Sequence, residues 1–171
     1  QKVLSNKSAL KLPGSKWALL TFFCYCSAEM TTGLWSSSYL VEHKAISAAA
    51  AAGLVALYYG GITAGRALTG FLTIRFSNNT LIFGGCLLSF TGIILYMLPL
   101  HAAFSAFSLV LIGVGFAPVF PCMIHETPVR FGKAASQTMM GLQMSFAYIG
   151  STFMPLLFGF IAGKLGTVLL P

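Results

Sequence analysis

The chain alternates between long apolar runs and short polar breaks. A run of about 20 apolar residues is long enough to cross the roughly 30 Å hydrocarbon core of a bilayer as a helix. Five runs reach this length and are predicted to be membrane-spanning helices: 17–41, 47–73, 80–100, 102–124 and 134–162. Because the breaks are short, neighbouring helices must run antiparallel. The pattern predicts an all-α fold, a polytopic transmembrane helix bundle without a soluble domain.

The two ends of the chain depart from this pattern. Residues 1–16 are polar and basic, so we expect a cytoplasmic linker there. Residues 163–171 are expected to form an outer stub or the start of a sixth span. Because the linker reads as a continuation of something upstream and the first residue is not Met, we expect a piece of a larger protein.

Composition places the chain in the membrane. It is 57% hydrophobic and 8% charged, with a mean hydropathy of +0.85, whereas soluble domains carry roughly 25% charged residues. A secreted protein would follow one short apolar segment with polar sequence, but here apolar runs recur to the end. We therefore expect an integral membrane protein, in contact with the lipid bilayer of the plasma membrane.

The basic residues lie mostly before the first apolar run or near the breaks between runs, and are not gathered on one surface. A nucleic-acid interface would need a basic patch interleaved with aromatic side chains, so no nucleic-acid partner is expected. With a cytoplasmic N-terminus, the basic residues near span ends divide seven inside to two outside, which is the bias of the positive-inside rule. The inside set is Lys2, Lys7, Lys11, Lys16, Arg75, Arg130 and Lys133, and the outside set is Lys44 and Lys164.

The four cysteines show no metal-ligand spacing. Cys24 and Cys26 are two residues apart and point to different sides of a helix, while Cys86 and Cys122 stand alone. We interpret them as apolar core thiols and expect no metal and no cofactor. The spans also lack Asp, paired carboxylates and a His at catalytic spacing from an acid, so we expect no enzyme activity.

One acidic residue, Glu29, interrupts the first apolar run. It lies 13 residues after Lys16, so it is roughly 20 Å along the helix and near the bilayer middle. An acid at that depth costs about 2.5–3.5 kcal/mol to insert and normally faces the bundle interior. Polar side chains share its helix face at spacings of three and four: Tyr25, Thr32, Ser36 and Tyr39. We interpret this stripe as the wall of a substrate or proton-coupling cavity; the alternative is a protonated Glu29 that serves only helix packing.

The second run contains one cation, Arg66, nine residues before Arg75 and thus roughly 13 Å from the cytoplasmic end. Arginine does not readily lose its proton and needs a counter-ion. We predict a structural or gating ion pair between Arg66 and Glu126, with Glu29 or an acid outside this chain as alternatives. Direct contact between Arg66 and a solute is a further interpretation.

The last run adds amides, hydroxyls and an aromatic ring along one face. Gln137, Gly141, Ser145, Tyr148 and Thr152 follow the helical spacing, and Gln143 lies slightly off it. A hydroxyl-rich solute needs such donors, acceptors and a flat ring. We therefore add Gln143 and Tyr148 to the predicted cavity.

The segment GRALTGFLTIRFSNNTLI resembles the major facilitator superfamily. In that family a cytoplasmic loop of each half reads approximately G-x-x-x-D-R-x-G-R-K, and Gly70 and Arg75 keep two of its positions. Three parts depart from it: Ile74 for the acid, Ser77 for the second glycine, and Asn78 and Asn79 for the basic pair. The departures weaken the prediction of a charged gate in this loop.

Three further segments, GLWSSSYL, GFAPVFPCMI and MSFAYIGSTFMPLLFGF, resemble helices of the fucose-permease-like branch, which contains sugar:proton symporters. The resemblance implies alternating access between two six-helix halves. This chain would supply five spans of the C-terminal half, and its partner would be a missing N-terminal half. Glu29, Tyr25 and Gln143 would line the cavity, although the coupling acids of this branch lie mainly in the other half.

These observations predict a fragment of a secondary active transporter that moves a small polar, sugar-like organic solute together with protons. The alternative is a stand-alone structural or assembly membrane protein without transport activity. Polar stripes on three spans count against that alternative, because a purely structural bundle does not need them.

Overall fold

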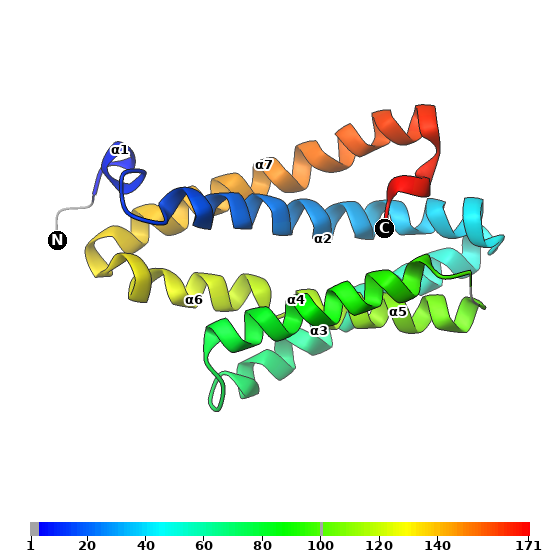
Figure 1. Ribbon diagram of the computed structural model, residues 1–171, viewed down its shortest axis with the longest axis horizontal. Helices are drawn as coiled ribbons and strands as arrows, with labels where there is room; N and C mark the ends of the chain where they lie inside the picture. Colours follow the sequence, from blue (N-terminus) through cyan, green and yellow to red (C-terminus); the bar gives the residue numbers. More distant parts are fainter. Residues whose placement is uncertain (1–3, 100) are drawn as a thin grey trace.

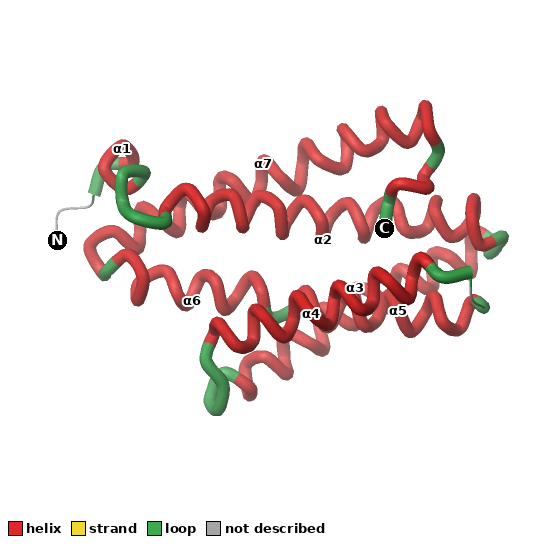
Figure 2. The backbone as a smooth tube through the Cα atoms, in the orientation of Figure 1, coloured by secondary structure: helices red, strands yellow, loops and turns green. Residues whose placement is uncertain are grey.

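The computed structural model describes residues 4–99 and 101–171 and is helical throughout, without a strand in that part of the chain (Figure 2). Residues 1–3 of the predicted linker and Leu100, the last residue of the predicted third span, lie outside the described residues. The elements are α1 (Asn6–Ala9), α2 (Ser15–Lys44), α3 (Ala48–Leu72), α4 (Asn78–Met97), α5 (Ala102–Phe116), α6 (Val119–Phe131), α7 (Lys133–Leu165) and the short 3₁₀ helix η1 (Thr167–Leu169).

Local sequence signals set several helix ends. Ser47 and Ser77 precede α3 and α4, and each side-chain oxygen accepts a hydrogen bond from a backbone N–H of the first turn, at 3.4 and 3.2 Å. Such caps satisfy N–H groups that have no partner within the helix. Gly132 and Gly166 flank α7, both with φ of +76°. Glycine enters this left-handed region without a steric penalty, so the chain reverses direction at both ends of α7.

The long helices form an up-and-down bundle (Figure 1). Helix α2 packs along α7 and also against α3, and α5 packs against both α3 and α4. The α3–α4 and α6–α7 connections lie at one end of the bundle, near the N-terminus. The α2–α3 and α4–α5 connections lie at the other (Figure 1). Successive helices therefore alternate in direction, except that α6 continues the course of α5.

The predicted fourth span is a bent pair of helices. Helix α5 ends at Phe116 and α6 begins at Val119, with Pro118 between them. Proline has no N–H to donate and clashes with the preceding turn, so it bends a helix. Helix α6 then continues to Phe131, beyond the predicted end at Ile124. The polar residues expected in a break therefore lie on a helix.

Four helical stretches are long and apolar enough to cross a membrane within the described residues: Ala48–Leu72, Asn78–Met97, Ala102–Phe131 and Lys133–Leu165. Helix α2 is 30 residues long but falls outside this set because its polar side chains lower its hydropathy. We predict that α2 also spans, since it runs beside α7 (Figure 1). The membrane boundaries of all five spans remain predictions.

The core between α2, α3, α4 and α5 is rich in tyrosine. Tyr58, Tyr96 and Tyr25 are buried, with exposed fractions of 0%, 2% and 7%. A buried phenol needs an acceptor for its O–H. Tyr58 donates to the backbone carbonyl of Glu29 (2.9 Å) and Tyr96 to that of Ser36 (3.3 Å). The tyrosines therefore connect neighbouring helices through oriented hydrogen bonds.

Glycines allow a close approach between α3 and α5. A Cβ added at Gly61 would lie 2.8 Å from the Val110 carbonyl oxygen, and one at Gly65 would lie 2.5 Å from the Ala117 Cβ. Small residues four apart let backbones approach where lipid reduces the hydrophobic drive for helix association. The outward face of α4 is instead a stripe of exposed large apolar side chains: Phe83, Leu87, Phe90, Ile94 and Met97.

Candidate functional site

Glu29 of α2 and Arg66 of α3 form an ion pair between the two helices. The Arg66 Nη2 donates to Glu29 Oε1 at 3.2 Å. The Glu29 side chain is 15% exposed, whereas that of Arg66 is 47% exposed. The pair therefore consists of a largely buried acid and a half-exposed cation.

The elements around Glu29 hold it in place. Tyr25, one turn earlier on α2, donates its hydroxyl to Glu29 Oε2 and also lies 3.1 Å from the Phe116 carbonyl oxygen of α5. Tyr58 of α3 donates to the Glu29 backbone carbonyl. Gly33, one turn later, lets α3 come close, because an added Cβ would lie 2.7 Å from the Tyr59 ring. Hydrogen bonds and close packing thus fix both the carboxylate and its backbone.

The ion pair borders a cavity of about 260 Å³ between α2, α3, α6 and α7, which we call the central cavity. Its lining includes the two charged groups and the polar side chains of Tyr148 and Ser151. The remaining lining residues are Cys26, Met30, Phe120, Met144 and Ala147. A mostly apolar surface with a few convergent polar groups is typical of a small-molecule site.

Only Glu29 of the predicted polar stripe lines the central cavity. Ser36 and Tyr39 are buried, and Tyr39 packs on Tyr96 with ring centroids 5.0 Å apart. Thr32 is half-buried and does not line the central cavity. The helical spacing placed these side chains on one face, but that face turns toward α3, α4 and α5. Most of the stripe is therefore a helix-packing surface, which corrects the predicted cavity wall.

Tyr148 and Gln143 of α7 belong to different cavities. Tyr148 lines the central cavity and is 70% exposed. Gln143 is 2% exposed, and its Oε1 accepts a hydrogen bond from the Thr127 hydroxyl of α6 at 2.9 Å. It faces a second cavity of about 200 Å³, which we call the terminal cavity. The predicted single cavity is thus two.

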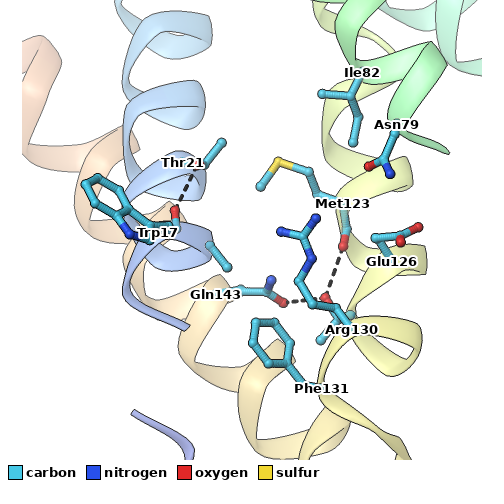
Figure 3. A pocket seen from close by; sticks show the side chains of 11 residues that line it. Trp17, Thr21, Asn79, Ile82, Met123, Glu126, Arg130, Phe131 and Gln143 are labelled. Carbon is cyan, nitrogen blue, oxygen red and sulfur yellow. Dashed lines mark hydrogen bonds between the residues drawn. The ribbon is translucent and has the colours of Figure 1, made fainter. Parts of the chain in front are cut away.

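The terminal cavity lies at the end of the bundle where α2 and α4 begin and α6 ends. Figure 3 shows Trp17 and Thr21 of α2 on one side, and residues of α4 and α6, among them Asn79 and Glu126, on the other. Arg130 of α6 also lines this cavity. Its polar groups are therefore more numerous than those of the central cavity.

The structure replaces the predicted Arg66–Glu126 pair by two separate contacts. Arg66 pairs with Glu29, which was the alternative partner. Glu126 Oε2 instead accepts a hydrogen bond from the Asn78 side chain at 3.0 Å. The reason is the continuation of α6 beyond the bend, which carries Glu126 to the N-terminus of α4 and away from α3. A carboxylate is favourable there because a helix N-terminus carries partial positive charge.

The two residues of the loop motif make few contacts. Gly70 lies in the last turn of α3, and a Cβ added there would meet nothing within 4 Å. Arg75 is exposed in the connection to α4, and no hydrogen bond or ion pair of its side chain occurs in the described part of the chain. A charged gate in this loop, which the departures from the motif already weakened, therefore has no contact to support it within the described residues.

Sequence reasoning missed several lining residues. Phe120 and Met144 border the central cavity but look like ordinary apolar core positions in the sequence. Ser151 follows Tyr148 by three residues and so shares its helix face, a signal that could have found it. No three His, Cys, Asp or Glu side chains come together as a metal site within residues 4–99 and 101–171.

The bent helix bundle with an intramembrane ion pair beside a cavity defines a polytopic helical membrane protein. Residues 1–155 match the family model of the Major Facilitator Superfamily. The chain therefore belongs to this family, which is a family of membrane transporters.

A yeast protein is similar to part of the chain. Bypass of stop codon protein 6 of Saccharomyces cerevisiae (strain ATCC 204508 / S288c) is 43% identical over 60 residues. The aligned stretch is 35% of this chain and 12% of the yeast protein. No solved structure matches the chain significantly.

Proposed function

We propose that the chain is the C-terminal half of a secondary active transporter that moves a small polar, sugar-like organic solute by alternating access, coupled to protons. The single observation that carries the proposal is the Glu29–Arg66 pair at the edge of the central cavity. Intramembrane ionisable groups that face a cavity are typical of solute and proton paths. An N-terminal half would close the cavity from the opposite side, as in transporters built from two repeats.

Proton coupling follows from the energetics of the pair. While Arg66 is near, its guanidinium compensates the charge of the Glu29 carboxylate. If Arg66 moves away, a charged carboxylate at membrane depth is costly, by about 2.5–3.5 kcal/mol on insertion scales, and protonation removes that cost. The separation of the two side chains during the transport cycle would therefore bind and release one proton.

The remaining functional proposals concern placement in the cell. We place the N-terminus in the cytoplasm and the protein in the plasma membrane, because the basic residues at span ends favour that orientation. The terminal cavity would then open toward the cytoplasm, since it lies at the end of the α3–α4 and α6–α7 connections (Figure 1), where Arg75 and Lys133 occur in the chain.

Replacement of Glu29 by Gln in the complete gene product tests this proposal, since Gln keeps the size but cannot ionise. We expect proton-driven accumulation of the solute to be lost while exchange of solute across the membrane continues. Glu42→Gln, the same change on an exposed acid near the C-terminal end of α2, is the matched control and should accumulate normally. Normal accumulation by Glu29→Gln would contradict the coupling role. A complete gene product that moves none of a panel of sugars and their acid derivatives would favour the alternative of a structural or assembly protein.

A further inference from the structure

We infer that the transported solute is a small organic anion, and that its carboxylate binds Arg66 in place of Glu29. This inference rests on the proposed transport function and names the chemical class of its solute. It follows from three features of the central cavity: the unequal hold on the two partners of the ion pair, the unused donors of Arg66, and the composition of the lining.

The two partners of the ion pair are held very differently. Glu29 accepts from Tyr25 at its carboxylate and from Tyr58 at its backbone carbonyl, and only 15% of its side chain is exposed. Among the described residues the Arg66 side chain donates one hydrogen bond, of 3.2 Å to Glu29, and is 47% exposed. Arg66 is therefore the partner that can move, and Glu29 is the one that stays.

Most N–H donors of the Arg66 guanidinium have no acceptor among the described residues. A guanidinium carries five N–H donors in a planar fork, and the hydrogen bonds of the described residues use one of them. A carboxylate accepts two parallel N–H bonds from such a fork, which are stronger and more directional than a single contact. A carboxylate ligand in the central cavity could thus accept two hydrogen bonds from Arg66, whereas Glu29 accepts one.

The cavity lining favours one charged group over many hydroxyls. Apart from the ion pair, the polar side chains that this chain contributes are Tyr148 and Ser151, while the sulfur-containing and apolar side chains make up the rest. Each buried hydroxyl of a neutral sugar would need its own hydrogen-bond partner. A compact acid needs the Arg66 fork, one or two hydroxyl contacts and an apolar surface for its carbon skeleton, and all three are present.

Replacement of Glu29 by the solute carboxylate as the partner of Arg66 leaves the net charge of the site unchanged. When the solute carboxylate takes Arg66, Glu29 loses its counter-ion and its Oε1 binds one proton from water, so the loaded site carries the same net charge as the empty one. The other titratable groups around the pair are phenols and thiols, whose usual pKa values lie well above that of a carboxyl; α6 contributes Phe120 and no titratable group. These phenols and thiols are Tyr25, Cys26, Tyr58, Tyr59 and Tyr148. Glu29 is therefore the group that changes charge, and one anion moves with one proton.

Uptake of matched neutral and acidic solutes by the purified complete gene product in proteoliposomes tests the inference. The pairs are glucose with glucuronate, galactose with galacturonate, and glycerol with lactate. We expect the acid of at least one pair to accumulate with an imposed pH gradient, and a potassium diffusion potential to leave the rate unchanged, because no net charge crosses. Preference for the neutral member, with uptake driven by the potential, would overturn the inference and leave the transport proposal standing. Uptake of neither member would remove both.

Variants of Arg66 test whether the solute anion binds to this side chain. Arg66→Gln should lower acid uptake by about tenfold or more, the loss expected for a hydrogen-bonded charge. Arg66→Lys keeps the charge without the fork and should raise KM while uptake stays independent of the potential. Lys164→Gln, the same loss of charge near the end of α7, is the control. Folding is checked by size-exclusion chromatography, and Arg66→Lys decides the question if Arg66→Gln does not fold. Unchanged acid uptake in folded Arg66→Gln would contradict the inference.

Discussion

Each of the three acidic side chains is held by a different kind of donor. Glu29 meets the Arg66 guanidinium, and Glu126 meets the Asn78 amide at the start of α4. Glu42, near the C-terminal end of α2, accepts from both the backbone N–H and the hydroxyl of Thr167, at 3.2 and 2.7 Å. The first contact joins neighbouring helices around a cavity. The last ties the end of α2 to the segment that follows α7.

The Glu42–Thr167 contact predicts a stability difference that depends on pH. The hydrogen bonds from Thr167 hold the pKa of Glu42 below its usual value. A lowered folded pKa adds stability above the unfolded pKa, and this contribution is lost as the pH falls through the folded pKa. Thr167→Val should therefore lower the thermal midpoint near neutral pH, and the difference from the unaltered protein should shrink as the pH falls below the ordinary glutamate pKa of about 4.3.

Thermal unfolding in detergent at several pH values measures this difference. Glu42→Gln serves as the control, because it removes the ionisable group and should show no loss of stability tied to this contact on acidification. A midpoint difference for Thr167→Val that stays constant from neutral to acidic pH would show that the hydroxyl acts by packing alone.

At the scale of elements, two features of α5 decide the shape of the bundle. Its C-terminal bend at Pro118 redirects the chain into α6, which reaches α4 and α7. Its glycine-lined contact with α3 brings two backbones close together, with Gly113 of α5 against Tyr58 and Gly61 of α3 against Val110. The close contact holds α3 in the position from which Arg66 reaches Glu29.

Two adjacent glycines of α3 test the importance of this contact. Gly61→Ala should destabilise the bundle by about 1–3 kcal/mol, because its Cβ would press on the Val110 carbonyl of α5 and overpacking costs that much. Gly60→Ala meets nothing within 4 Å and should be neutral or stabilising, since alanine is the better helix former by about 1 kcal/mol. Thermal midpoints of the two purified variants give the comparison. Equal effects of the two substitutions would contradict the close α3–α5 contact.

At the scale of the whole molecule, the alternating helices separate the connections into two groups. Arg75, between α3 and α4, and Lys133, at the start of α7, lie at one end, and Lys44, at the end of α2, lies at the other (Figure 1). The asymmetry in basic residues predicts that the first group faces the cytoplasm.

Cysteines introduced singly at these three positions test the orientation in intact cells. The four natural cysteines are first replaced by serine or alanine to remove background labelling. A membrane-impermeant thiol reagent added outside should label position 44 and leave positions 75 and 133 unlabelled until the membrane is permeabilised. Labelling of position 75 but not position 44 would reverse the orientation.

The sequence by itself determined the fold class and the family. Long apolar runs separated by short breaks leave transmembrane helices as the structure that satisfies every backbone hydrogen bond in lipid, and the degenerate loop motif at Gly70 and Arg75 indicated the superfamily that the family match then confirmed. It also singled out Glu29 and Arg66, because an acid or a cation inside an apolar run is visible in the amino-acid sequence alone.

Only the tertiary structure decided which residues meet. Helical spacing shows that Tyr25, Ser36 and Tyr39 share a face, but not which neighbour that face touches, and the packing of α3–α5 turned it into the core. The partner of Arg66 depended on the bend at Pro118, which carries Glu126 toward α4 and leaves Glu29 as the acid within reach. Gln143 meets Thr127 of α6 and lines the terminal cavity, whereas Tyr148 lines the central cavity. Local sequence determines the direction of a side chain around its own helix, whereas the helix that it meets depends on crossings set by distant residues, here the glycines between α3 and α5.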